Sequence, residues 1–126
     1  MLRSLLVVFA GSASLLLATP AHSAPQLYEG SYVCSLSWNM ILGNIWLYAD
    51  GTFVGPSFEP DGPRHPFEIT ESNTINWGAP LGGMDSGGNK VVGTVVRDAG
   101  GGKAGFDIQM QLQSGNFSTA SCAPDF

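Results

Sequence analysis

The sequence predicts an all-β fold: a small antiparallel meander of about eight short strands, closed into a barrel or a rolled sandwich. Three observations predict it. Apolar and polar residues alternate with the two-residue period of strands, whereas helical periodicity is scarce. Turn-forming stretches rich in glycine, asparagine and aspartate separate these segments. The two cysteines, Cys34 and Cys122, lie in the first and the last of the expected strands.

The first five expected strands occupy residues 28–40, 45–49, 52–54, 67–70 and 74–77. In the first, apolar side chains take the even positions and mostly polar ones the odd positions, as in a half-buried strand. The second is apolar on both faces, and Asp50-Gly51 turns it into the third, because both turn residues tolerate positive φ. Gly55-Pro56 ends or bends the third strand. The fourth and fifth are short and are joined at Ser72-Asn73.

The last three expected strands occupy residues 90–97, 103–113 and 117–122, after a glycine-rich surface loop at 78–89. Residues 90–97 are rich in β-branched side chains, and Ser114-Gly115-Asn116 turns the chain into the last strand. We expect the even-numbered faces of the first and seventh strands to line the interior together. Their apolar residues there include Leu36, Trp38, Phe106, Ile108, Met110 and Leu112.

The stretch DAGGGKAGF, Asp98 to Phe106, has the glycines and the lysine of a phosphate-binding loop. Such a loop opens a helix, however, and carries Ser or Thr directly after its lysine. Here Lys103 is followed by Ala104 and Gly105 and then by the most regular strand pattern in the chain. The sequence therefore predicts a hairpin turn here and no nucleotide site.

The first 24 residues have the order of a secretory signal peptide: Arg3, an apolar run and then small residues. Cleavage after Ala21, Ser23 or Ala24 fits the small-residue rule, and residues 25–126 then form one domain. Gly and Ser interrupt the apolar run, which falls short of the roughly 20 residues of a membrane-spanning helix. We therefore expect a secreted or periplasmic protein without a membrane span in its mature chain. In such a protein Asn116-Phe117-Ser118 is a glycosylation sequon.

Two cysteines in an oxidising compartment predict one disulfide, between Cys34 and Cys122. The alternative, two free or metal-binding thiols, lacks partner ligands in the sequence. A disulfide needs the two Cα atoms within about 7 Å of each other. In a meander, the first and last strands meet only if the sheet closes on itself, so the cysteines favour closure.

The charge pattern excludes several classes of function. Five Lys and Arg residues stand against ten Asp and Glu, a net charge of −5, and no basic stripe is present, so we expect no nucleic-acid partner. His65 is the one histidine beyond the predicted signal peptide, and the acidic residues match no calcium loop, so we expect no metal and no cofactor. No catalytic residue is assigned, although a Ser-His-Asp arrangement around His65 is kept as an alternative.

The aromatic residues have two interpretations, a filled barrel core or the lining of a pocket at one barrel mouth. Trp46 lies in a strand that is apolar on both faces and is therefore a candidate for contact with a ligand or partner. We predict a contact site from this residue and its neighbours along the chain, together with a charged pair in a proline-rich loop: Trp46, Tyr48, Phe53, Arg64 and His65.

The stretches GSYVC, DGTFVGP and INWGAPL, with the closing cysteine, resemble the small secreted β-barrels of the calycin kind. Lipocalins, avidins and small barrel inhibitors of secreted metalloproteases belong there. The chain lacks the glycine-x-tryptophan opening usual in lipocalins and has Tyr32 in place of that ring. The resemblance implies binding of a small apolar ligand or a protein surface. Two alternatives stay open: an inhibitor of a secreted hydrolase, acting through residues 25–28 or 55–66, and a small hydrolase using His65.

Overall fold

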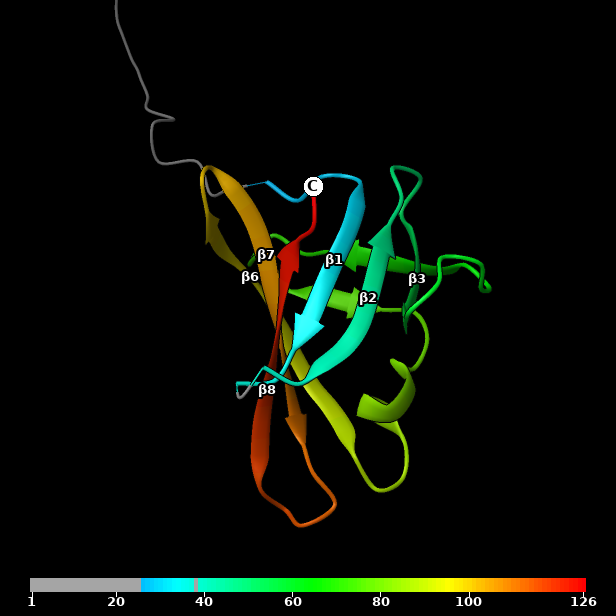
Figure 1. Cartoon of the computed structure of the whole chain (residues 1–126), viewed down its shortest axis with the longest axis vertical. Coiled ribbons are helices and arrows are strands. Elements are labelled where there is room, and N and C mark those ends of the chain that lie inside the picture. The colour runs from blue at the N-terminus through cyan, green and yellow to red at the C-terminus, as the bar shows by residue number, and fades with distance from the viewer. Residues whose placement is uncertain (1–25, 38) are drawn as a thin grey trace, which may run out of the picture.

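A computed structural model describes residues 26–37 and 39–126 (Figure 1). Its strands are β1 (Gly30–Ser35), β2 (Ile41–Leu47), β3 (Thr52–Ser57), β4 (His65–Ile69), β5 (Ile75–Trp77), β6 (Lys90–Gly100), β7 (Lys103–Gln111) and β8 (Phe117–Pro124). A turn of 3-10 helix, η4 (Gly82–Asp85), lies between β5 and β6. The predicted all-β fold with eight antiparallel strands is confirmed.

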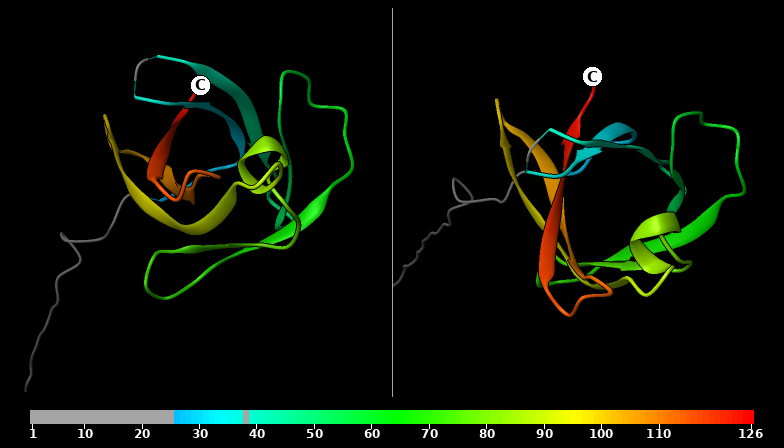
Figure 2. Two further views of the ribbon diagram at one scale, coloured as in Figure 1. Left: turned by 90° about the horizontal axis from the view of Figure 1, so that it is seen from below. Right: turned by 60° about the horizontal axis from the view of Figure 1, so that its bottom comes forward.

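The strands form a meander in the order β5-β4-β3-β2-β1-β8-β7-β6. Neighbours in this order are consecutive in the chain except β1 and β8, which pair antiparallel because the sheet curls round on itself. In the views of Figure 2 the strands surround a common axis as a ring. The β1–β8 register places Cys34 opposite Cys122, and a disulfide joins them. The predicted disulfide and the closure that we derived from it are both confirmed.

The barrel is nearly closed, and its seam lies between β5 and β6. An isolated bridge between Thr74 and Val95 and a hydrogen bond from Val96 N to Asn73 O take the place of a full ladder here. The sequence predicted closure, but the position of the seam became clear only from the structure.

The interior contains the alternating apolar residues that the sequence predicted for β7. Phe106, Ile108 and Met110 are buried, while Leu36 and Leu112 are half-buried. The core comprises Tyr32, Cys34, Ile45, Leu47, Phe53, Ile75, Leu81, Met84, Phe106, Ile108, Met110, Ala120 and Cys122.

The expected surface loop at 78–89 contributes two of these core residues, which corrects the prediction. Leu81 is fully buried and Met84 is 5% exposed. They are three residues apart across the 3-10 turn η4, and side chains with this spacing share one side of such a turn. The loop therefore turns an apolar side towards the barrel.

The first strand is shorter than predicted. β1 ends at Ser35 and β2 begins at Ile41, so the alternation over 28–40 runs on through a turn. Leu36 N donates to Met40 O, Asn39 N donates to Leu36 O, and Asn39 has a φ of 68°. Asparagine tolerates this left-handed conformation, and so the chain turns here without a glycine. Met40, at an even position of the pattern, is 51% exposed.

The glycine-rich stretch forms the β6–β7 hairpin, as predicted. Gly100 pairs with Lys103, and Gly101 and Gly102 at the tip have φ values of 63° and 79°, which favour glycine. Lys103, which ends this turn, donates from Nζ to Phe126 O in an exposed contact.

Two predictions fall outside the described residues: the signal peptide at 1–24 and the interior position of Trp38. Both stay predictions. Within the described part of the chain, no helix is long and apolar enough to cross a membrane.

Candidate functional site

Three predicted contact residues, Trp46, Tyr48 and Arg64, lie on the outside of the barrel. Trp46 is half-buried on β2, where the register places it between Ser31 of β1 and Val54 of β3. Tyr48 follows β2, and the guanidinium carbon of Arg64 lies 3.5 Å from the centroid of its ring. The structure therefore brings Tyr48 and Arg64 together in a cation–π contact.

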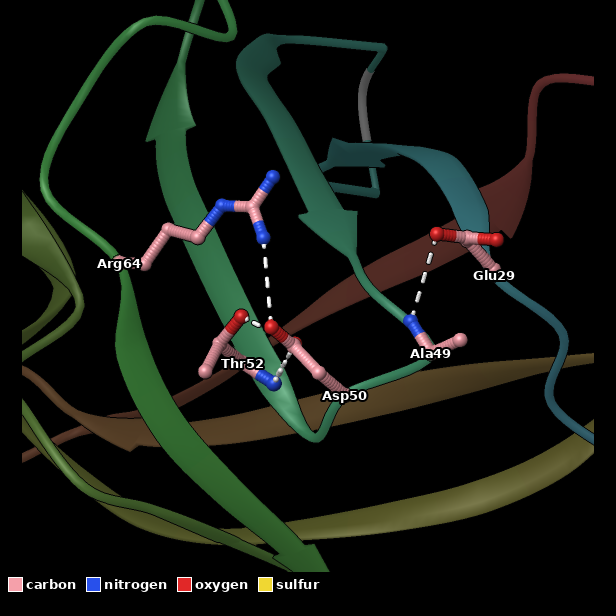
Figure 3. Close-up of polar contacts among 5 residues, drawn as sticks. All are labelled: Glu29, Ala49, Asp50, Thr52 and Arg64. Atoms are coloured by element: carbon pink, nitrogen blue, oxygen red, sulfur yellow. Dashed lines mark hydrogen bonds and ion pairs between the residues drawn. The ribbon is translucent and has the colours of Figure 1, made fainter.

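Arg64 also reaches the turn between β2 and β3 (Figure 3). Its Nη1 lies 3.4 Å from Asp50 Oδ2, while Asp50 Oδ1 accepts hydrogen bonds from Thr52 Oγ1 at 2.6 Å and Thr52 N at 3.1 Å. The hydrogen bond from the Thr52 hydroxyl, assisted by the Arg64 charge, lowers the pKa of Asp50 below its ordinary value. Beside them, Ala49 N donates to the Glu29 carboxylate at 3.3 Å. Because Arg64 and Asp50 are both exposed, their ion pair orders the turn but contributes little net stability.

The other two predicted contact residues, Phe53 and His65, face each other across β3 and β4. Phe53 is 1% exposed and packs inside the barrel, with its ring centroid 4.8 Å from that of Trp77. His65 is half-buried, 6.1 Å from Phe53 between ring centroids, and belongs to a strand rather than to the loop in which the sequence placed it. The five predicted residues thus lie on two sides of the sheet, and their role as a contact site stays a prediction.

The loop between β3 and β4 folds over the outside of the barrel. Val54, on the outer face of β3, is only 3% exposed, and Gly62 of the loop lies against it. Ser57 Oγ donates to Glu59 O at 2.6 Å and so fixes the start of the loop. Phe58, the next residue, is 74% exposed, more than any other large apolar side chain in the described part of the chain.

Aromatic rings fill the half of the barrel interior near the C-terminus. Neighbouring ring centroids are 4.8 to 6.5 Å apart. Phe126, which is 50% exposed, packs edge-on against Tyr32 from outside the core. The rings inside belong to Tyr32, Phe53, Phe67, Trp77 and Phe106. For these residues the structure favours the core interpretation over an aromatic pocket.

The opposite end of the barrel holds a cavity of about 380 Å³, which we call the apolar pocket. Its lining residues come from the strand ends, from η4 and from the segments beside them, and η4 lies at the edge of the ring in Figure 2. They are Leu36, Leu42, Pro56, Gly83, Met84, Asn89, Met110, Leu112 and Ser118. The volume lies within the range of small-molecule sites, which are typically lined by apolar side chains with few polar groups.

A wider groove of about 560 Å³ runs along the seam between β5 and β6. Trp77 Nε1 donates to Thr94 Oγ1 across it at 2.8 Å. Asp85 also borders the groove, but its two oxygens already accept hydrogen bonds from Leu81 N and Val91 N, at 3.0 and 2.8 Å. Trp77, Thr94 and Asp85 thus use their polar groups within the fold, and we take the apolar pocket as the candidate site.

The sequence analysis assigned no ligand contact to the residues of the apolar pocket. It placed Leu36, Met110 and Leu112 on the interior face but did not consider Leu42 or Met84. A signal was present in β7, where the inner face passes from a ring at Phe106 to flexible aliphatic side chains. A barrel filled by rings at one end and by aliphatic chains at the other is a candidate for a cavity at the aliphatic end.

Within the described residues, no three His, Cys, Asp or Glu side chains gather into a group that could hold a metal ion. Comparison of the chain with protein-family models, with curated proteins and with solved structures finds no match. The function of the site is therefore inferred from its own geometry and chemistry.

Proposed function

We propose that the chain is a secreted or periplasmic binding module of calycin-like architecture that takes a small apolar ligand in the apolar pocket. The observation that carries the proposal is a cavity of about 380 Å³ at one barrel mouth with mainly apolar walls. The buried Cys34–Cys122 disulfide supports an oxidising compartment.

The energetics of the pocket support ligand capture. Transfer of apolar ligand surface from water to these walls contributes roughly 25 cal/mol for each Å² buried. Met84 and Met110 are unbranched and flexible, so they can adapt to ligands of different shape. The disulfide and the ring-filled half of the barrel hold the strands in place, which reduces the ordering cost of binding.

Titration with the neutral apolar fluorophore N-phenyl-1-naphthylamine tests the proposal. We expect the dye to become brighter on binding to the wild-type protein, because it enters an apolar environment. In Leu112→Trp a large ring fills the rim of the pocket, and we expect the dye affinity to fall by tenfold or more. Val95→Trp is the matched control, because Val95 is 52% exposed and lies outside the pocket.

Both variants are checked by thermal melting, so that a loss of binding is not confused with unfolding. Wild-type protein that does not bind the dye, or Leu112→Trp that binds it as tightly as Val95→Trp, would contradict the proposal. The second candidate function, inhibition of a secreted hydrolase, would then be favoured. Its supporting observation is Phe58, which projects from a loop held at Ser57 and Arg64.

A further inference from the structure

The apolar pocket has few polar side chains, and they differ in what they already bind. The Asn89 amide is held by backbone groups at both ends: Nδ2 donates to Gly83 O at 3.2 Å and Oδ1 accepts from Gln113 N at 3.1 Å. Ser118 also lines the pocket, and its hydroxyl forms no hydrogen bond with any of the residues that the structure describes. A hydroxyl both donates and accepts, so Ser118 is free to bind either a donor or an acceptor of a ligand.

No lysine or arginine lines the described part of the pocket. Lys90 is the nearest in sequence to a lining residue, and it pairs with Gln111 in the ladder between β6 and β7. Met110 and Leu112 line the pocket, and Gln111 alternates with them, so Gln111 and Lys90 point to the outer face. The other cations bind elsewhere: Arg64 beside Tyr48, Arg97 on Asp107, and Lys103 on the C-terminal residue.

A negative charge lies close to the pocket wall. Asp85 follows Met84 directly, and its carboxylate stays in place because it accepts two backbone hydrogen bonds. The chain as a whole has a net charge of −5. An anionic group in the pocket would meet repulsion from this charge and no compensating cation. A cationic group would also be buried unpaired, because no carboxylate of the described residues lines the pocket and Asp85 borders the seam groove instead, and burial of an unpaired charge is costly.

We infer that the ligand of the apolar pocket is an uncharged, mainly aliphatic molecule with one hydroxyl or carbonyl group, which forms a hydrogen bond with Ser118. This inference rests on the proposed function and names the chemical class of its ligand. The apolar walls bind the aliphatic part, and Ser118 orients the polar group.

Displacement of N-phenyl-1-naphthylamine by 1-octanol, octanoate and octylammonium at neutral pH tests the charge preference, because the three share one chain length. We expect 1-octanol to displace the dye at a concentration at least tenfold lower than either ion. Displacement by either ion at the same concentration as 1-octanol, or at a lower one, would overturn the inference. Dye binding would still be intact in that case, so the proposed function would survive; absence of dye binding would remove both.

Ser118→Ala tests the hydrogen bond, with protein made in a host that adds no N-linked glycans. We expect the affinity for 1-octanol to fall by about fivefold, the usual effect of one lost neutral hydrogen bond. Thr119→Ala is the matched control, because Thr119 is the next residue on β8 and is exposed outside the pocket. Octanol affinity that is the same in Ser118→Ala and Thr119→Ala would show that Ser118 does not contact the ligand.

Discussion

Tyr32 lies where the N-terminal segment, the core and the C-terminus meet. Its ring centroid is 5.3 Å from that of Phe106 and 5.5 Å from that of Phe126. Its hydroxyl donates to Tyr28 O at 2.6 Å and accepts from Tyr28 N at 3.1 Å. Burial raises the pKa of Tyr32 above its ordinary value, and the backbone hydrogen bond with Tyr28 acts in the opposite direction.

The folded protein therefore holds the Tyr32 proton more tightly than the unfolded chain, and its free energy of unfolding falls as the pH rises above about 10. In Tyr32→Phe the two lost hydrogen bonds with Tyr28 lower the free energy of unfolding by about 2 kcal/mol at neutral pH. Above about pH 10 we expect this variant to lose stability less steeply than the wild type, because it has no phenol to ionise. Urea unfolding at a series of pH values measures how steeply the free energy of unfolding falls with pH in each protein. Equal slopes would show that ionisation of Tyr32 does not contribute to the loss of stability.

Among the elements, the segment between β5 and β6 contributes most to the candidate site. It carries Leu81 into the core and forms one wall of the apolar pocket with Met84. The Asp85 carboxylate holds the segment at both ends, because one oxygen accepts from Leu81 N and the other from Val91 N. A single side chain thus connects the wall of the pocket to the start of strand β6.

Replacement of Asp85 by alanine removes both acceptors. We expect Asp85→Ala to lower the free energy of unfolding by about 2 kcal/mol and to weaken dye binding, since Met84 loses its fixed position. Asp85→Asn keeps one carbonyl acceptor, so its stability should lie between those of the alanine variant and the wild type. Asp61→Ala is the control, because Asp61 is exposed in the β3–β4 loop. The role assigned to Asp85 is wrong if Asp85→Ala unfolds at the same urea concentration as Asp61→Ala.

Turn positions were predicted well where glycines mark them. Asp50-Gly51 turns β2 into β3, and the glycines after Asp98 form the tip of the β6–β7 hairpin. The turn after Ser35 was missed because apolar residues at Leu36 and Met40 continue the even-numbered pattern without a glycine or proline. The alternation shows only which side chains are apolar. Apolar and polar residues can go on alternating through a turn, so the pattern does not show where a strand ends.

At the scale of the whole molecule, closure of the barrel was predictable and the candidate site was not. Two cysteines at opposite ends of a meander leave a closed sheet as the simplest geometry. The apolar pocket, in contrast, arises where strand ends and η4 meet, at Leu42, Met84 and Leu112. Its walls depend on how far each strand extends and on where the seam falls. Local sequence patterns carry neither kind of information.

The Cys34–Cys122 disulfide carries the last prediction, because it joins the two strands at which the meander closes. It closes a loop of 88 residues, and in the chain-entropy model such a crosslink stabilises the fold by on the order of 4 kcal/mol. We expect the free energy of unfolding of the double variant Cys34→Ala/Cys122→Ala, measured in urea, to be lower by about this amount.

Ser35→Ala/Ser121→Ala is the matched control, since these residues form the next pair of the same ladder, and it should unfold at a urea concentration close to that of the wild type. Two free thiols per chain in the native protein, or equal stability of the two double variants, would contradict this account. The β1–β8 ladder would then close the barrel through its backbone hydrogen bonds and packing, without a contribution from the crosslink.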